Sequence, residues 1–192
     1  MTPITPHLAE ELWYKSKKEG FVSNESYPRF KPDEIFEKEE VGEYLISKVV
    51  DDISEILKVT SIKPKKIYVY TTPKWKQDIF RQSIELAEKN QFNIKDIMKQ
   101  ILSKPGMKVI AKEVSQFVGK LSSEVMKLND EDKERYLVDL NEYDYLTDAK
   151  GYLENMFSCK VEVFKADDRN KEDPINKARF AAPLRPAIYI VK

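Results

Sequence analysis

Lysines recur at four-residue steps in the middle of the chain: Lys104, Lys108, Lys112 and Lys120 follow this spacing, with Gln116 in the intervening place. Side chains four residues apart lie on the same face of an α-helix, so these lysines would form a basic band opposite the helix's apolar stripe. Such a band can neutralise nucleic-acid phosphates and release their counterions. The same spacing also fits a solvated helix face, and both interpretations stay open.

The C-terminal stretch 179–192 carries a second group of candidates. Pro183 and Pro186 stiffen its backbone, so neighbouring groups would be presented in fixed positions. Cationic side chains there can pair with phosphates, and aromatic rings can stack on unpaired bases. The candidates for contact with a nucleic acid in this stretch are Arg179, Phe180, Arg185 and Tyr189.

Further lysines surround the first expected strand: Lys63, Lys65, Lys66, Lys74 and Lys76. They are candidates for phosphate contact, although a purely solvating role is equally consistent with their positions. Trp75 lies beside them near the start of an expected helix, where we expect a packing anchor rather than a base-stacking ring.

The sequence offers few residues for catalysis, metal binding or nucleotide binding. The chain has one histidine, His7, and one cysteine, Cys159, which leaves no internal disulfide and no cysteine-based metal cluster. Its five glycines form neither common type of phosphate-binding loop. Glu10 and Glu11 are adjacent and point to different sides of a helix, so they do not form a catalytic pair. The residues therefore favour binding over catalysis.

The composition is typical of a folded, soluble protein, with 41% hydrophobic and 34% charged residues. No run approaches the roughly 18 apolar residues of a membrane span, and no basic segment followed by an apolar core opens the chain. The single cysteine agrees with a reducing compartment. We therefore expect a cytoplasmic protein that does not bind a membrane.

A formal net charge of zero conceals a segregation of charge along the chain. The balance of basic over acidic residues is −5 in 1–60, +8 in 61–129, −7 in 130–173 and +4 in 174–192. Two basic blocks separated by an acidic one make a polyanionic partner plausible, because clustered Lys and Arg contact phosphates whatever the net charge.

Apolar periodicity and turn residues indicate six helices after the first segment and three short strands. The expected helices cover 33–58, 75–88, 93–102, 107–128, 130–141 and a stretch ending near Phe157, and the expected strands cover 67–71, 160–164 and 187–191. Asp33 is the expected cap of the first of these helices. Strands far apart in sequence with helices between them predict a small, helix-rich α+β domain with about three strands in its sheet.

The apolar pattern breaks at Ser61 to Pro64, which predicts a boundary between a helical region, 1–62, and an α+β domain, 63–192.

The first helix has a recognisable pattern. Pro3-Ile4-Thr5-Pro6-His7-Leu8-Ala9-Glu10-Glu11-Leu12-Trp13 reads as a short helix capped by Thr5, with Leu8 and Leu12 on one apolar face. About three turns cannot bury such a stripe alone, so we expect it to have packed against helices that precede this segment. The run resembles the last helix of the anticodon-binding domain in class I aminoacyl-tRNA synthetases of the valine, isoleucine and leucine group.

Two further stretches sharpen this resemblance. Ile67-Tyr68-Val69-Tyr70-Thr71-Thr72-Pro73-Lys74-Trp75-Lys76 and Ala182-Pro183-Leu184-Arg185-Pro186-Ala187-Ile188-Tyr189-Ile190 are similar to the C-terminal region of archaeal and eukaryotic leucyl-tRNA synthetases. The resemblance implies that 1–62 is the end of the anticodon-binding helical bundle and that 63–192 is the C-terminal tRNA-binding domain. It also implies that the partners are leucine tRNA, through its long variable arm and outer corner, and the remainder of the synthetase chain.

By resemblance, the parent enzyme joins leucine to its tRNA using ATP with magnesium. The motifs of the class I ATP site, of the His-Ile-Gly-His and Lys-Met-Ser-Lys-Ser types, do not occur here. We therefore expect no cofactor in this chain and no aminoacylation by it alone.

A protein-interaction module is the alternative, because the acidic 130–173 block and the amphipathic helices could dock another factor or the synthetase itself. Binding that weakens in salt would favour RNA, whereas apolar docking would be comparatively insensitive to salt.

Overall fold

The computed structural model describes residues 4–27, 29, 31, 35–89, 91–103 and 106–192. Contacts divide the chain into two compact units, Met1–Phe36 and Glu37–Lys192. The structure is α+β, as the sequence predicted, and the strands found among the described residues lie in the second unit.

The first unit contains helix α1 (Pro6–Lys15) and the short 3-10 helix η1 (Val22–Asn24). The carboxylate of Glu10 accepts hydrogen bonds from the backbone N–H groups of Val22 (2.9 Å) and Ser23 (3.1 Å), which ties η1 to α1. Glu10 is therefore a structural residue of this unit. Leu8 and Leu12 remain 49% and 45% exposed, so the apolar stripe of α1 is not buried within this unit.

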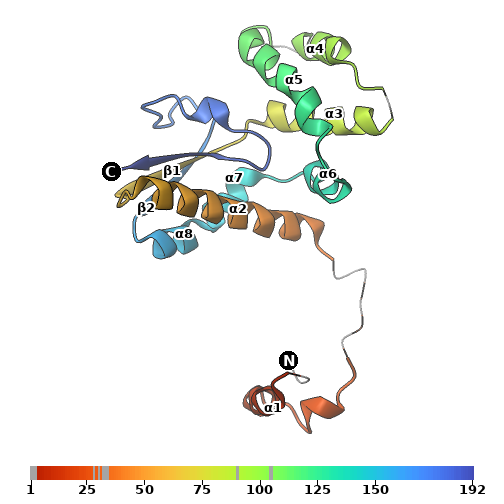
Figure 1. Ribbon diagram of the computed structural model, residues 1–192, viewed down its shortest axis with the longest axis vertical. Helices are drawn as coiled ribbons and strands as arrows, with labels where there is room; N and C mark the ends of the chain where they lie inside the picture. Colours follow the sequence, from red (N-terminus) through yellow and green to blue (C-terminus); the bar gives the residue numbers. More distant parts are fainter. Residues whose placement is uncertain (1–3, 28, 30, 32–34, 90, 104–105) are drawn as a thin grey trace. The chain divides into compact units, whose positions relative to one another are not determined.

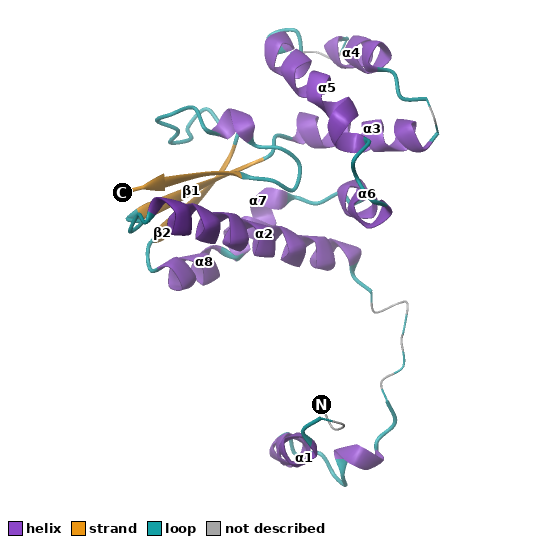
Figure 2. Ribbon diagram, viewed as in Figure 1, coloured by secondary structure: helices purple, strands orange, loops and turns teal. Residues whose placement is uncertain are grey.

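The second unit is built on a three-stranded sheet in the order β2-β1-β3 (Figure 2). Strand β1 (Lys66–Thr71) pairs in parallel with β2 (Lys160–Lys165) and antiparallel with β3 (Ala187–Val191). A parallel pair needs a crossover connection, and helices α3 to α8 all lie in the segment that joins β1 to β2. All three strands coincide with the predicted ones within a residue or two.

The helices of the second unit follow the predicted segments, with shifts at their ends. They are α2 (Glu37–Thr60), α3 (Lys74–Glu88), α4 (Ile94–Leu102), α5 (Ala111–Val125), α6 (Asp130–Leu137), α7 (Glu142–Asp148) and α8 (Lys150–Phe157). Asp33, the predicted cap of α2, lies outside the described residues.

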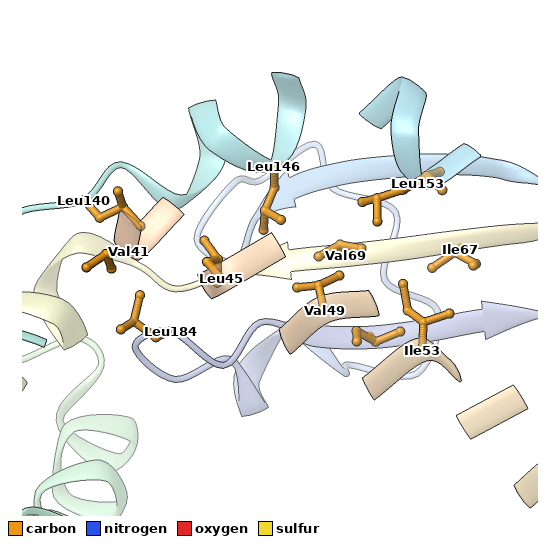
Figure 3. Packing of buried hydrophobic residues seen from close by; sticks show 12 residues of the cluster. Val41, Leu45, Val49, Ile53, Ile67, Val69, Leu140, Leu146, Leu153 and Leu184 are labelled. Carbon is orange, nitrogen blue, oxygen red and sulfur yellow. The ribbon is translucent and has the colours of Figure 1, made fainter. Parts of the chain in front are cut away.

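Successive side chains of β1 point to opposite faces of the sheet, and both faces are buried. Ile67 and Val69 face a core that α2, α7 and α8 complete, with Leu45, Val49 and Ile53 of α2 fully buried (Figure 3). In Figure 1, α2 and α8 run along the same side of the sheet. On the opposite face, Tyr68 and Tyr70 join a cluster that includes small residues of the segment before β3.

Helix α2 packs against the sheet. Its apolar face forms the main core together with the sheet, so α2 belongs to the compact unit that begins at Glu37. The predicted division at residue 62 falls in the turn between α2 and β1 and stays a prediction about the family's domains.

A second core lies among α3, α4 and α5, where nine buried apolar residues gather, including Ile84, Val118 and Leu121. Trp75 packs its ring edge-on against Phe117 of α5, with centroids 5.7 Å apart. This contact confirms that Trp75 is a packing anchor.

Candidate nucleic-acid interface

The basic band is only partly helical. Helix α5 begins at Ala111, four residues later than predicted, because Gly106 adopts a positive φ of 82° and 107–110 form turns. Lys112 and Lys120 are exposed on α5, whereas exposed Lys108 precedes the helix. Lys104 lies outside the described residues.

The C-terminal candidates lie on a loop before β3. We call residues 177–186 the strap; it contains the 3-10 turn η3 (Ala178–Phe180) and a tight turn in which Ala182 and Arg185 exchange backbone hydrogen bonds. Arg179, Phe180 and Arg185 are exposed on it. The strap thus presents one aromatic and two cationic side chains to solvent.

Two interactions join the strap to the interior. The ammonium of Lys76, only 6% exposed, donates to the carbonyl oxygens of Arg179 (2.9 Å) and Ala181 (2.7 Å). The carboxylate of Glu142, 2% exposed, accepts from the backbone N–H groups of Leu184 and Thr72, both at 2.8 Å.

Burial shifts the pKa of both groups. Desolvation lowers the pKa of Lys76, and the negative charge of Glu113 opposes that shift. Desolvation raises the pKa of Glu142, although its hydrogen bonds from the Thr72 and Leu184 backbone act in the opposite direction.

The strap brings the two predicted groups of candidates together. A hollow of about 500 Å³ between α5 and the strap is lined by Lys112 and Lys120 on one side and by Arg179 and Phe180 on the other. Lys76 and Phe117 also line it, as do the carboxylates Glu113 and Glu124. Cations from two segments about 60 residues apart in sequence therefore surround one hollow, with carboxylates between them.

A second hollow, of about 580 Å³, lies on the α2 side of the strap. Apolar side chains, including Ile56, Val59 and Ile188, contribute to its lining. Its charged lining residues are Asp52, Glu55 and Glu124, which are acidic, and Lys177 and Arg185, which are basic.

Phe180 lines both hollows and is 59% exposed. The Arg179 guanidinium lies 4.6 Å from the centroid of its ring, and the Lys177 ammonium lies 5.7 Å from it. An exposed ring flanked by cations can stack on a base while the cations meet the adjoining phosphates.

Cations elsewhere differ in their availability. Lys66 pairs with Glu162 at 2.9 Å and Glu172 at 3.4 Å, and the hydrogen bond to Glu162 is the main cause of its raised pKa. Lys74 pairs with Asp139 and, at 3.7 Å, with Asp78. Lys65 is exposed and has no such partner within the described residues.

By contrast, Lys112, Lys120, Arg179 and Arg185 form no salt bridge anywhere in the described part of the chain. Their charges are therefore free to meet an external anion.

Tyr189 is half-buried on β3, and its ring stacks on Tyr68 with centroids 6.0 Å apart. That contact occupies one face of the ring. Ile188 and Ile190 pack in the core of the other sheet face.

Sequence reasoning missed Lys177 and Glu142 as residues of this surface, and it did not predict that Lys76 is buried. Lys76 follows Trp75 at the start of an amphipathic helix, and its position next to that packing anchor was the available signal of burial. No sequence signal distinguishes Glu142 from the other acidic residues of its block, since its role depends on backbone groups of distant segments.

Among the described residues, no helix combines the length and apolar character needed to cross a membrane. Nor does this part of the chain hold a group of three or more His, Cys, Asp or Glu side chains arranged for a metal ion.

Comparisons with known proteins agree with the resemblance. Residues 1–69 match the family described as the anticodon-binding domain of tRNA ligase. Over 191 residues the chain is 37% identical to the leucine–tRNA ligase of Methanosarcina mazei, and over 190 residues it is 38% identical to that of Methanococcus maripaludis. A third relative, the leucine–tRNA ligase of Methanococcoides burtonii, is 34% identical over 193 residues.

These matches cover 99% of the chain but only 20%, 18% and 20% of the three relatives, so the chain spans about a fifth of their length. The family match ends at residue 69, inside β1, and thus includes both α1 and α2. Over nearly its whole length the chain is therefore similar to archaeal leucine–tRNA ligases, which is consistent with a C-terminal region of an archaeal-type leucyl-tRNA synthetase.

Proposed function

We propose that this chain is the tRNA-binding region of a cytoplasmic leucine–tRNA ligase and that it contacts the long variable arm and outer corner of leucine tRNA. The matched family and the names of the relatives support a tRNA ligase. The observation that carries the proposal is the gathering of unpaired cations around exposed Phe180.

The strap and α5 form the phosphate-binding part of this surface. Lys112 and Lys120 from α5 and Arg179 from the strap line one hollow, so a backbone that enters it meets positive charge from both sides. The carboxylates Glu113 and Glu124 confine this attraction, because a phosphate near them is repelled.

The second hollow suits an unpaired base. Phe180 supplies a stacking face, and Ile56 and Val59 supply apolar surface beside it. Asp52 and Glu55 can accept hydrogen bonds from the exocyclic amino groups that adenine, cytosine and guanine carry and uracil lacks.

Chemistry resides elsewhere in the proposed parent enzyme. The ATP- and magnesium-dependent formation of leucyl-tRNA requires motifs that this sequence lacks, so this region positions tRNA for the remainder of the synthetase chain. No step of that reaction is assigned to residues described here.

The test compares the chain's affinity for leucine tRNA, for the same tRNA with a shortened variable arm, and for an unrelated tRNA, each at two salt concentrations. We expect tightest binding to the intact long arm, weakening in salt because phosphate contacts release counterions. Equal affinity for all three would contradict recognition of the arm, and no binding to any would contradict RNA binding by this region.

One observation favours the alternative of a protein-docking module. A hollow of about 530 Å³ between α2 and α7–α8 is lined by the carboxylates Glu43, Asp51 and Asp148 together with Tyr145 and Tyr152. Such a surface repels phosphates and suits a basic, apolar segment of another protein or of the synthetase itself. Salt-insensitive binding of a protein, with no RNA binding, would favour this alternative.

A further inference from the structure

Lys76 occupies an unusual position for a lysine. It lies in the first turn of α3, is 6% exposed, and its ammonium lies 5.6 Å from the ring centroids of both Trp75 and Phe117. No carboxylate in the described part of the chain forms a salt bridge with it. Its two hydrogen bonds go instead to backbone carbonyls of the strap, on either side of Phe180.

Glu142 makes the complementary contact. Its two carboxylate oxygens accept from backbone N–H groups on two segments, Thr72 after β1 and Leu184 in the strap. Leu184 has a positive φ of 52°, a backbone conformation that costs free energy for a residue other than glycine. The hydrogen bond from its N–H to Glu142 holds this turn in place.

Burying a charge is unfavourable unless hydrogen bonds compensate for lost hydration. An apolar side chain could fill either site without that cost, but it could not hold backbone carbonyls or an N–H group. The two buried side chains therefore hold the strap at two places, Lys76 at residues 179 and 181 and Glu142 at residue 184.

We propose that Lys76 and Glu142 are positioning residues: their hydrogen bonds hold the strap so that Phe180 and Arg179 meet the RNA. This inference rests on the proposed function for its effect on RNA. It rests on the structure alone for its effect on the strap.

A double-mutant cycle tests the first effect. We expect Lys76→Met and Phe180→Ala each to weaken binding of leucine tRNA about tenfold, and the double variant to bind little worse than either. Lys112→Ala, on α5, is the matched control, because its effect should multiply with that of Lys76→Met. Unchanged affinity in Lys76→Met, or effects of Lys76→Met and Phe180→Ala that multiply, would overturn the proposal.

Hydrogen exchange of the free chain tests the second effect without RNA. In Lys76→Met and in Glu142→Gln, amides of 178–185 should exchange faster, while those of β1 and α5 keep their wild-type rates. Lys76→Gln, which retains a donor, should show a smaller change and serves if Lys76→Met fails to fold. Strap exchange at wild-type rates in folded variants would overturn the inference. Faster strap exchange without RNA binding by the wild-type chain would instead contradict only the proposed function.

Discussion

Replacing Phe180 by alanine removes the exposed ring at the centre of the candidate interface. The side chain is 59% exposed, so the change should alter the free energy of unfolding by no more than about 0.5 kcal/mol. Stacking of a base on an aromatic ring contributes about 1–3 kcal/mol to binding. We therefore expect affinity for leucine tRNA to fall by about 5- to 150-fold, without loss of fold.

The dependence on salt separates stacking from charge. Phe180 carries no charge, so Phe180→Ala should leave the slope of log affinity against log salt unchanged. Arg179→Ala, at the neighbouring position, should reduce the magnitude of that slope by about one. Affinity would be measured by fluorescence anisotropy at several salt concentrations, with circular dichroism to verify folding.

Phe180→Trp is the matched variant, because it keeps a ring of greater stacking area and should bind at least as tightly as the wild type. The reasoning would be refuted if Phe180→Ala bound leucine tRNA as the wild type does. It would also be refuted if Phe180→Trp lost as much affinity as Phe180→Ala.

Other predictions concern charge, packing and pH. Lys74→Ala should change tRNA affinity far less than Lys112→Ala, because Lys74 already pairs with Asp139; equal losses by anisotropy would argue against the location of the interface. Gly42→Ala should destabilise the chain by about 1–3 kcal/mol in urea unfolding, since a Cβ there would lie 2.3 Å from the Tyr145 ring; unchanged stability would contradict this packing. Lys74 and Arg81 hold the pKa of Asp139 at about 2, so its stabilising contribution is present above pH 4 and lost between about pH 4 and 2. Asp139→Asn should therefore cost up to about 1 kcal/mol at pH 7, a value limited by the exposure of the carboxylate, and progressively less as the pH falls from about 4 through 2; a cost that does not depend on pH would contradict the assignment.

The sequence predicted the strands well because their patterns are local. Ile67-Tyr68-Val69-Tyr70 is β-branched and aromatic with prolines on both sides, and the alternation of its side chains matches the two faces that the sheet buries. It could not predict that β1 pairs in parallel with β2 and antiparallel with β3, since strand order depends on how the intervening helices pack.

Helix ends were predicted less well, as with α5. The apolar period runs from Met107 to Leu128, but the positive φ at Gly106 leads into turns before the helix begins at Ala111. The apolar residues of the turns still pack against the α3–α5 core, so periodicity continued beyond the helix itself. For this reason Lys112 and Lys120 of the predicted band lie on α5, whereas Lys108 precedes it.

The candidate site depended on contacts that no local pattern reveals. Exposed Arg179, Phe180 and Arg185 could be proposed from residue type, but their closeness to α5 and α2 could not. Likewise, no local sequence feature distinguishes Lys66 from Lys76, since both are lysines close to the ends of β1. One is held in surface salt bridges, and the other is buried beneath the strap.

The most direct measurement is site-specific photocrosslinking from position 180. A benzophenone-bearing amino acid would replace Phe180, the chain would be irradiated with leucine tRNA, and the attached nucleotides would be mapped. A second probe at Tyr152, which lines the acidic hollow beside α2, provides the control position. The account predicts crosslinks to the variable arm from position 180 and none from position 152. Crosslinks from position 152 alone, or none from position 180, would contradict it.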